Sequence, residues 1–447
     1  MYNKLLLFIC FFVLVNCNEE NINSQEPNFT YEYELTEDVL VHDQENVYNN
    51  LVLICLNGGK TPYLVDKGGN IKYSWSFDAF LGNDFELLPN GKTLGIFKSI
   101  NPAFSFGGYG GVINLFDQNN ILEWTYEVSN EIEIAHHDVE LLKNGNIMIM
   151  VWEKIEVDTH QNFGVDFDQP IYVEKLIEVN PETNEIVWQW RSWDHIIQEH
   201  DNNASAFGSV IQNPHKIDIN YNLQSNGDFM HANGIDLDET NDLIYMSVNF
   251  FSEIWVIDHS TTTEQASTSS GGNYNKGGDL IYRFGNPLAY GNTQEQRIFY
   301  RNHFPNLLEN GVPGEGNILV YSNYGENNSE QSHIYELQLP DILALEPENV
   351  LSPEVVWSFT DESLFHGKIS GADRLQNGNT LICEGDFGVW EVTPDKEVVW
   401  KYSNENFSNY WRCYGYSFGD SALEFIGLEI CKYKTHNFYL FFNNVFC

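Results

Sequence analysis

Three histidines stand at the same place in an internal repeat of the chain. His137, His231 and His303 each lie seven residues before the polar turn residue that ends a short apolar segment. Two further copies of this segment carry Asn83 and Ser370 at the same place. If the repeats surround an axis, these side chains converge. Converging imidazoles predict a catalytic or binding site, because histidine can act as a nucleophile or as a general acid near neutral pH.

The repeat extends beyond the histidine segments. An Asn-Gly turn or a similar one leads into alternating β-branched and aromatic residues, as at 92–97, 146–152 and 379–385. Two more segments of this kind follow, and the last ends in an aromatic pair in six copies. Such alternation broken by tight turns predicts antiparallel strands. Repeats of about 40–50 residues with four strands each are typical of propeller blades, so we expect an all-β protein, a six-bladed β-propeller of four-stranded antiparallel blades.

The connections between the predicted strands differ on the two faces of the ring. Asn-Gly turns make one face compact, whereas the connections on the other face are long, at 97–112, 152–172, 191–230 and 285–302. Long loops without their own secondary structure are usually functional. The innermost strands begin on the long-loop face. We therefore expect His137, His231 and His303 to line the mouth of the central channel under these loops.

The charge of the chain limits its partners. There are 22 Lys and Arg against 64 Asp and Glu, which gives a formal net charge of −42. Nucleic acid and anionic membrane surfaces are poor partners for such a chain. An anionic substrate would need a local positive pocket, so the few cations are informative. The 447 residues, 42% of them hydrophobic, suffice for one large all-β domain.

The N-terminus predicts export. Lys4 precedes an apolar run that stops at a cysteine, Cys17. This pattern resembles a bacterial lipoprotein signal, in which cleavage before Cys17 leaves a lipidated N-terminus, although Asn16 replaces the usual small residue. We expect a protein held on the bacterial outer membrane, at its periplasmic or surface face, by this lipid anchor alone. An ordinary secretory signal is the alternative.

These features divide the chain into four parts: a signal peptide at 1–16, a tether at 17–46, the propeller at 47–412, and a C-terminal segment at 413–447. The last part is expected to close the propeller and then to continue as a divergent tail. Cys55 and Cys383 lie in strand patterns and are expected to be buried small hydrophobes. No cysteine pair has metal-ligand spacing, and we expect no metal.

Longer motifs resemble the bacterial arylsulfotransferase family, the aryl-sulfate sulfotransferase-like proteins. They include HHDVELLKNGNIMIMVWEK, HANGIDLD, GGDLIYRFGNP and SGADRLQNGNTLICEGDFGVWEV, and the resemblance spans about residues 50–410. Members of this family are six-bladed propellers. They move a sulfuryl group from a phenyl sulfate ester to a phenol through a transient sulfohistidine, without a nucleotide donor. The resemblance implies that activity here, with phenolic sulfates and phenols as small-molecule partners and with no cofactor.

The resemblance also implies roles for individual residues. His303 matches the nucleophile, and His231 or His137 would protonate the leaving oxygen. Asn233, in the His-x-Asn motif, would hold a sulfate oxygen, and His136 belongs to the paired-histidine segment.

Two positions depart from the family pattern. Asn302 precedes the nucleophile in place of a glutamine, and Asn249 stands where the family often has an arginine. Both remain candidate substrate-binding residues. Lys154, Arg374 and Arg412 are candidate cations for the sulfate, and each could equally be a structural ion-pair partner. Arg412 lies where the chain should return to complete the first blade.

Two other functions stay open. The propeller could be a non-catalytic surface lipoprotein that binds a glycan or an aromatic ligand. A calcium-dependent, lactonase-like hydrolase would need carboxylates that converge on the channel, and only Asp84 and Asp138 stand near the shared position. Five histidines outside the repeat lie in polar stretches and are expected to be solvated: His42, His160, His195, His200 and His436. His259 is expected on the face with the tight turns, and His366 could reach the site.

Overall fold

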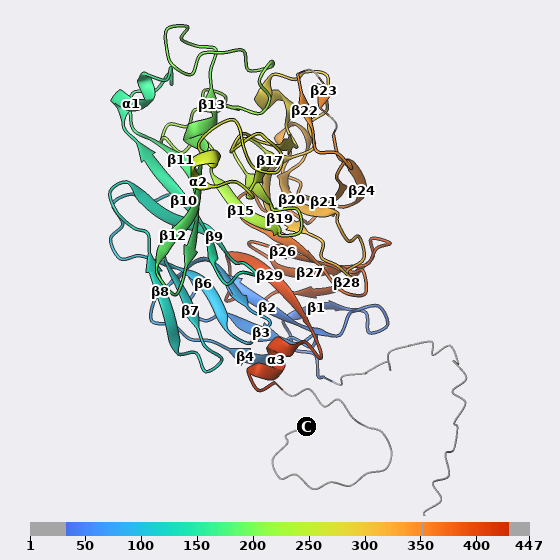
Figure 1. Cartoon of the computed structure of the whole chain (residues 1–447). Helices are drawn as coiled ribbons and strands as arrows, with labels where there is room; N and C mark the ends of the chain where they lie inside the picture. Colours follow the sequence, from blue (N-terminus) through green and yellow to red (C-terminus); the bar gives the residue numbers. More distant parts are fainter. Residues whose placement is uncertain (1–32, 348, 351, 429–447) are drawn as a thin grey trace, which may run out of the picture. The chain divides into compact units, whose positions relative to one another are not determined.

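The computed structural model describes residues 33–347, 349–350 and 352–428 (Figure 1). These residues form six four-stranded antiparallel blades arranged in a ring, which confirms the predicted six-bladed β-propeller. The predicted signal peptide, the lipidation residue Cys17 and the segment from residue 429 onward lie outside the described residues.

Each blade runs from an innermost to an outermost strand. The first three blades contain β29 (Tyr410–Ser417), β2 (Asn50–Leu56), β3 (Tyr63–Val65) and β4 (Ile71–Ser74); β5 (Leu81–Leu87), β6 (Thr93–Lys98), β7 (Gly111–Phe116) and β8 (Leu122–Glu127); and β9 (Glu133–Leu141), β10 (Ile147–Ile155), β11 (Ile171–Asn180) and β12 (Glu185–Arg191). The next two contain β15 (Ala232–Asp238), β16 (Leu243–Val248), β17 (Glu253–Asp258) and β18 (Tyr282–Phe284); and β19 (Tyr300–Leu307), β20 (Ile318–Tyr324), β21 (His333–Gln338) and β24 (Glu354–Phe359). The sixth contains β25 (Gly371–Arg374), β26 (Thr380–Glu384), β27 (Gly388–Val392) and β28 (Val398–Tyr402), with β1 (Val39–His42) as a fifth strand at its outer edge.

The loops carry short elements only. They are the pairs β13 (Ile196–Ile197) with β14 (Ile217–Asp218) and β22 (Leu345–Glu346) with β23 (Asn349–Val350), the helices α1 (Val157–Gln161), α2 (Thr263–Ala266) and α3 (Ser421–Phe425), and the 3-10 helices η1 (Ser192–His195), η2 (Pro287–Tyr290) and η3 (Glu326–Asn328).

The ring closes by joining distant parts of the chain. The late strand β29 pairs with β2 as the innermost strand of the first blade, whereas the early strand β1 pairs with β28 of the sixth. Side chains reinforce this seam. Lys67 Nζ lies 2.7 Å from Glu391, and the indole of Trp400 donates to the backbone oxygen of Lys67. Closure of this kind ties the two ends of the propeller together and completes the first blade.

Tryptophans in the outer strands pack the blades together. Trp188 and Trp190 on β12 are buried, and their indole nitrogens donate to Thr261 and to the backbone oxygen of Gly278 beside the next blade. Burial of large aromatic rings between sheets favours a rigid ring, and an indole needs a polar partner when it is buried. The ring therefore supplies a firm frame for residues at the channel.

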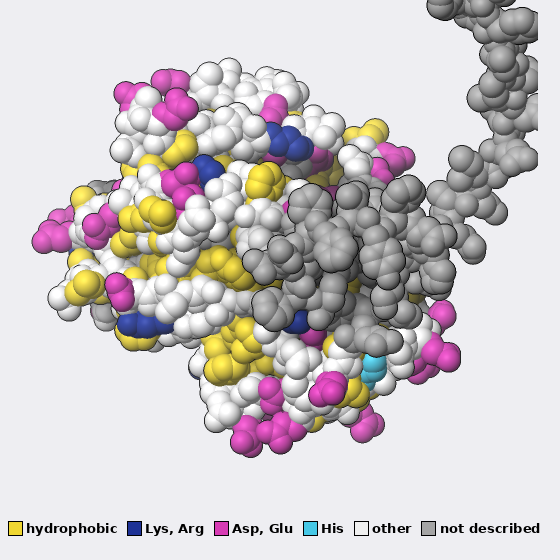
Figure 2. All heavy atoms as spheres, turned by 90° about the horizontal axis from the view of Figure 1, so that it is seen from below, with side chains coloured by type: hydrophobic (Ala, Val, Ile, Leu, Met, Phe, Trp, Pro, Cys, Tyr) yellow, Lys and Arg dark blue, Asp and Glu magenta, His cyan; other side chains and the backbone are white. Residues whose placement is uncertain are grey.

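The surface reflects the acidic composition. In the face shown in Figure 2, acidic side chains lie around the periphery of the described surface, and Lys and Arg are few. Cys55 and Cys383 are buried and unbridged, as predicted. No helix in the described part of the chain is long and apolar enough to cross a membrane.

Candidate active site

A β-bulge marks the predicted histidine position in the innermost strands. The pairing register shifts at this place between β9 and β10, between β15 and β16, and between β19 and β20. His137 and His231 have left-handed backbone angles there, with φ of 54° and 49°, and Ser370 has a φ of 114°. Bulges re-aim side chains, and unusual backbone angles concentrate at functional sites. The repeat thus supplies a kink, and the residue type at the kink decides the chemistry.

A cavity of about 1290 Å³ opens at this position, and long loops contribute to its wall. His137 and His231 lie in the wall, with ring centroids 4.9 Å apart. His303 is buried beneath the wall and contacts Trp411, which lines the cavity. The Trp411 ring lies 5.7 Å from that of His137 and 6.1 Å from that of His303. The three histidines therefore form one cluster, although the cavity surface includes only two of them.

The surroundings of His303 fix the position of its proton. Its Nδ1 lies 2.6 Å from Oδ1 of Asn323, whose amide nitrogen donates to the backbone oxygens of His366 and Ile369. Because the Asn323 amide is oriented by these two bonds, its oxygen must accept from His303, so Nδ1 carries the hydrogen. Burial lowers the pKa of His303 to about 3. The ring is therefore neutral, and Nε2, which has no hydrogen-bond partner among the described residues, carries the lone pair.

His231 has the opposite electrostatic environment. Burial alone would lower the pKa of His231, but the Asp228 carboxylate outweighs this effect and raises it. The Nδ1 atom of His231 lies 2.5 Å from Oδ2 of Asp228, and Oδ1 of the same carboxylate accepts from the His231 backbone. The imidazole also stacks on Phe250, with a centroid distance of 4.7 Å. His231 is thus the member of the cluster that holds a proton most readily.

His137 is supported by a buried pair of residues, His136 and Glu174. Its Nδ1 lies 2.8 Å from Nδ1 of His136, whose Nε2 lies 3.0 Å from the Glu174 carboxylate. Burial holds the pKa values of both histidines well below the usual range. On the other side, Nε2 of His137 approaches Gly108, where a side chain would collide with the ring. His136 therefore lies behind His137 and outside the cavity wall, where it orients its neighbour.

The predicted amide residues form one network around a backbone oxygen. The side chains of Asn233 and Asn249 both donate to the carbonyl of Asn302, at 2.8 and 3.0 Å. The Asn302 side chain in turn donates to Ser247 and to the backbone of Glu253. Of the three asparagines, only Asn249 lies in the cavity wall. The Oδ1 atom of Asn233 is buried and has no partner in the described part of the chain, so it can still accept a hydrogen bond.

The structure does not bring Lys154 and Arg374, two of the three predicted cations, to this cavity. Lys154 pairs with Glu156 at 2.7 Å, and neither residue lies in the cavity wall. Arg374 pairs with Glu336 of the neighbouring blade at 2.6 Å and lines a different cavity at the tight-turn end of the channel. Sequence periodicity placed both residues near strand ends. It could not show which neighbour each long side chain would contact.

Arg412 occupies the centre of the channel beside Trp411. Its guanidinium binds both oxygens of Asp138, at 2.8 and 2.9 Å, and lies 3.3 Å from Asp84. The two carboxylates that a calcium-dependent hydrolase would need are thus already engaged by a cation. Within the described ranges, no group of three or more His, Cys, Asp or Glu side chains has an arrangement suited to a metal ion.

Three residues of the site were not identified from the sequence. Trp411 occupies the repeat position of the first blade, seven residues before the turn at Phe418, and aligning β29 with the other inner strands would have revealed it. Asp228 precedes His231 by three residues in a long loop, where periodicity gives no information. Arg301 lines the cavity, with its guanidinium 4.5 Å from the Phe250 ring, and no repeat position pointed to it.

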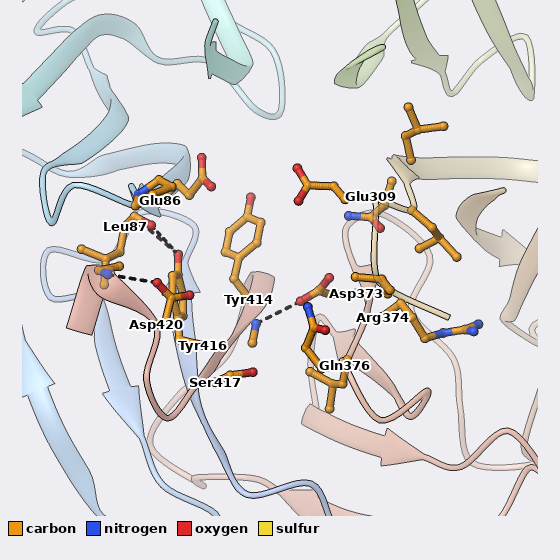
Figure 3. A pocket seen from close by; sticks show the side chains of 18 of the residues that line it. Glu86, Leu87, Glu309, Asp373, Arg374, Gln376, Tyr414, Tyr416, Ser417 and Asp420 are labelled. Atoms are coloured by element: carbon orange, nitrogen blue, oxygen red, sulfur yellow. Dashed lines mark hydrogen bonds between the residues drawn. The ribbon is translucent and has the colours of Figure 1, made fainter. Parts of the chain in front are cut away.

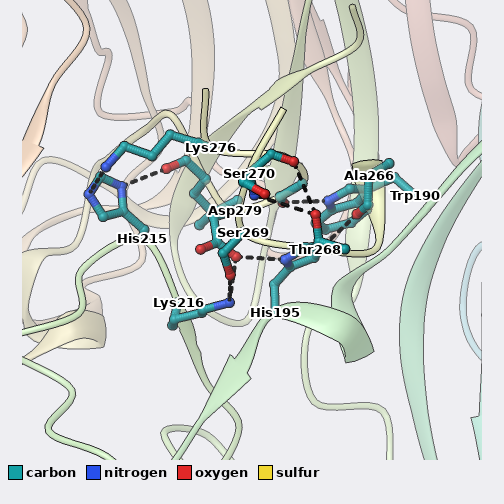
Figure 4. A network of polar contacts seen from close by, with 12 residues as sticks. Trp190, His195, His215, Lys216, Ala266, Thr268, Ser269, Ser270, Lys276 and Asp279 are labelled. Atoms are coloured by element: carbon teal, nitrogen blue, oxygen red, sulfur yellow. Dashed lines mark hydrogen bonds and ion pairs between the residues drawn. The ribbon is translucent and has the colours of Figure 1, made fainter. Parts of the chain in front are cut away.

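A buried polar network anchors the longest loop to the fourth blade (Figure 4). His195 binds Asp279 through Nδ1 at 2.7 Å and the backbone oxygen of Ala266 through Nε2 at 2.8 Å, and Lys216 contacts the same carboxylate. His160 is also buried and binds a backbone oxygen. The prediction that these two histidines are solvated was wrong, because loop packing decides their burial. His366, by contrast, does lie in the cavity wall.

The opposite end of the channel holds a smaller, acidic cavity (Figure 3). It has a volume of about 360 Å³, and no histidine is among its lining residues. Its wall contains Glu86, Glu140, Asp236, Glu309 and Asp373. Burial raises the pKa of Glu86 to about 8, of Asp236 to about 7 and of Asp373 to about 6.

The fold is a six-bladed β-propeller, and a cavity beneath its long loops holds a cluster of histidines. The family described as Arylsulfotransferase (ASST) matches residues 36–408, which is most of the chain. The protein belongs to the arylsulfotransferase family, and this membership supports aryl sulfotransferase activity in general.

Other comparisons are more distant. A protein of unknown function from Bacteroides caccae is similar at a TM-score of 0.47 and 11% identity, over 83% of this chain and 99% of that one. Hydrazine synthase from Kuenenia stuttgartiensis is similar at a TM-score of 0.34 and 10% identity, over 63% and 67% of the two chains. A comparison with curated proteins finds no match. Likenesses of this strength carry no weight for function.

Proposed function

We propose that this protein transfers a sulfuryl group from a phenolic sulfate ester to a phenolic acceptor through a sulfohistidine at His303, without a nucleotide donor. The observation that carries the proposal is the contrast between His303 and His231. Burial keeps His303 neutral, whereas the Asp228 carboxylate raises the pKa of His231. Environments that push the pKa values of neighbouring groups apart are what a nucleophile and its general acid require.

In the first step, Nε2 of His303 attacks the sulfur of the donor. The bond between sulfur and the phenolic oxygen breaks, and its electron pair goes to that oxygen. His231 gives its proton to the same oxygen, so a neutral phenol leaves. The hydrogen on Nδ1 of His303 stays there and is donated to Oδ1 of Asn323, and this hydrogen bond stabilises the charge that develops on the ring.

In the second step, an acceptor phenol takes the place of the first product. His231, now neutral, removes the phenolic proton while the oxygen attacks sulfur. The bond between sulfur and Nε2 breaks, its electron pair returns to the imidazole, and both histidines regain their starting states. Two easier steps thus replace one difficult transfer.

Polar atoms near His303 suit the sulfate oxygens. The indole nitrogen of Trp411 is buried without a partner among the described residues, so its hydrogen can be donated to an oxygen of the transferring group. The Asn249 amide lies in the cavity wall and 3.4 Å from Nδ1 of His303. Because Nε2 of His303 is itself covered, we expect Trp411 to shift when the donor enters.

The cavity wall is also suited to an aromatic ring. Its aromatic members are Phe106, Phe250, Tyr324, Phe365 and Trp411. Such side chains bury apolar ring surface and pack against it edge-on or offset. They would also suit a non-catalytic protein that binds an aromatic ligand, so activity must separate the two functions.

The decisive experiment is transfer from 4-nitrophenyl sulfate to phenol, with and without the acceptor. We expect a burst of 4-nitrophenol with donor alone, followed by turnover when phenol is added. Mass spectrometry of the donor-treated protein should find one sulfuryl group on the peptide that contains His303. Binding of aryl sulfates without any burst or adduct would favour the non-catalytic function.

We further propose that the protein is exported and held on the outer membrane by a lipid at Cys17. The support is the N-terminal sequence alone. Cys17→Ser should move the protein from the membrane fraction to the soluble fraction after cell disruption. Membrane association that survives this change would contradict the lipid anchor.

A further inference from the structure

Two arginines lie side by side at the edge of the histidine cavity. Arg297 and Arg301 line a small polar cavity of about 270 Å³. This small cavity adjoins the histidine cavity, because Arg301, Phe250 and Asn328 belong to the walls of both. A ligand seated against the histidines can therefore extend a substituent toward the two guanidinium groups.

Neither arginine has an ion-pair partner within the described ranges. The chain has a net charge of −42, and the Lys and Arg residues that are buried in the described ranges are all paired: Lys67 with Glu391, Lys175 with Glu133, Arg283 with Glu253 and Arg412 with Asp138. The carboxylate of Glu253 acts on Arg297 from a distance, but Arg283 already binds it. Two adjacent, partly buried cations without an anion are therefore exceptional in this molecule.

The two guanidinium groups differ in how much of their hydrogen bonding is satisfied. Arg297 donates to the backbone oxygen of Phe299 and to the hydroxyl of Ser252, both at 2.6 Å. The guanidinium of Arg301 makes one long hydrogen bond, 3.4 Å to Asn249, in the part of the chain that the structure describes. It lies over the Phe250 ring, which also stacks on His231. Arg301 thus keeps most of its fork available for a planar anion.

We propose that Arg301, supported by Arg297, binds a second anionic group on the aryl substrate. The preferred acceptors are then phenols that carry a carboxylate, and the preferred donors are the sulfate esters of such phenols. This inference rests on the proposed sulfuryl transfer. With the phenolic oxygen at His231 and the ring along Phe250, an acidic substituent meets Arg301. A local positive site of this kind is what an anionic substrate needs on so acidic a protein. It also gives selectivity, because an uncharged substituent leaves two partly buried cations without an anionic partner.

The test compares 4-carboxyphenyl sulfate with its methyl ester as donors, and likewise the 3-substituted pair. For each protein, the measured quantity is the ratio of kcat/KM for the acid to that for the ester. Because the intrinsic reactivity of the two donors cancels between proteins, only changes in recognition remain. We expect Arg301→Gln to lower this ratio by about tenfold or more for at least one pair, since hydrogen bonds to a charged group are strong. Arg301→Lys, which keeps the charge but not the fork, should lose less.

The matched control is Lys143→Gln, which makes the same charge change at an exposed site outside this cavity. It should leave the ratio as in the native protein. An unchanged ratio in Arg301→Gln for both donor pairs would overturn the proposal.

A binding measurement separates this inference from the proposed reaction. In a His303→Gln background, calorimetry should find that 3- or 4-hydroxybenzoate binds more tightly than its methyl ester, and that Arg301→Gln removes the difference. If this holds while no protein transfers sulfuryl groups, the anion subsite stands and the proposed reaction fails. If transfer occurs but carboxylate and ester bind alike, the subsite is refuted and the reaction stands.

Discussion

The two ends of the central channel use the same strand positions for different chemistry. At the long-loop end, the repeat position carries His137, His231 and Trp411. Three residues beyond the repeat position, at the tight-turn end, three inner strands carry an acidic residue. These residues are Glu140 after His137, Glu86 after Asn83 and Asp373 after Ser370. At both ends, titratable groups lie around one axis. Only at the long-loop end do neighbouring residues shift the pKa values of these groups in different directions.

The difference lies in how the pKa values are arranged. At the histidine end, burial lowers the pKa of His303 while Asp228 raises that of His231, which is what the proposed mechanism needs for a nucleophile and a proton donor. At the acidic end, burial and mutual repulsion raise the pKa values of Glu86 and Asp236 in the same direction. A ring of similar groups that all resist ionisation has no acid and base of different strength. The comparison indicates that specific neighbours, and not burial in the channel, make a reactive site.

The largest expected effect comes from removing the nucleophile. His303→Gln should reduce sulfuryl transfer by about 10³-fold or more, because no other group can form the sulfohistidine. Glutamine can still donate a hydrogen bond to Asn323, so the free energy of unfolding should change by no more than about 1–3 kcal/mol. Initial rates with 4-nitrophenyl sulfate and thermal unfolding check the two statements. Substantial remaining turnover in a folded variant would remove His303 from the mechanism.

Much of the fold could be predicted from the sequence, because the same pattern of strands and turns occurs in several copies. Asn-Gly turns and alternating apolar residues specify hairpins locally, and six copies specify the ring. The same register brought His137 and His231 to one cavity. Trp411 was not predicted because β29 is far in the chain from the rest of its blade, and because its repeat position carries an indole where other copies carry a histidine or a small polar residue.

The loops were much less predictable. Asp228 lies in a connection whose course depends on tertiary packing, such as the contact of His195 with Asp279. Arg301 lies in β19, two residues before the repeat position of that strand, so the register did not indicate it. The candidates Lys154 and Arg374 failed to reach the cavity because each has a carboxylate close by. A long cationic side chain contacts whichever partner the fold supplies, and strand register does not reveal that partner.

The next largest effect is expected from a change that reduces the pKa difference between His231 and His303. Asp228→Asn removes the carboxylate that raises the pKa of His231, so that pKa should fall. Because the donor step needs protonated His231, kcat/KM for the donor should fall by about a hundredfold near neutral pH. The loss of activity on the alkaline side should also begin at lower pH, and activity should partly recover on acidification. A full pH profile of kcat/KM measures both effects.

The matched control for this change is Asp386→Asn. Asp386 also lines the cavity, but its carboxylate lies near His366 instead of His231. Its profile should keep the native alkaline limb. If Asp228→Asn showed an unshifted limb, His231 would not be the proton donor.

A third change displaces a histidine without replacing it. A methyl group at Gly108 would collide with Nε2 of His137, and the φ of 88° at this position is strained for any other residue. We expect Gly108→Ala to shift His137 against His231 and to lower kcat/KM about tenfold, since small displacements of reacting groups are costly. Gly107→Ala is the control, because nothing lies within 4 Å of a side chain there. Equal activity of the two variants would exclude a positional role for His137.

The smallest expected effect on activity comes from the acidic end, where a change should alter stability alone. Burial and the neighbouring Asp84 and Asp138 raise the pKa of Glu86 from 4.5 to about 8. The folded protein therefore binds a proton that the unfolded chain releases, and stability is lost as the pH rises from 4.5 to about 8. Glu86→Gln lacks this loss, so its free energy of unfolding relative to the native protein should increase by about 1–3 kcal/mol between about pH 5 and about pH 8. Urea denaturation at both pH values measures the increase, and Glu182→Gln, in an exposed turn, should show none.

Sulfuryl transfer by Glu86→Gln should match that of the native protein, because the layer of Arg412, Asp84 and Asp138 is unchanged between the altered residue and the histidines. A loss of activity without a gain in stability would mean that the two ends of the channel are coupled, and that the acidic cavity takes part in the reaction.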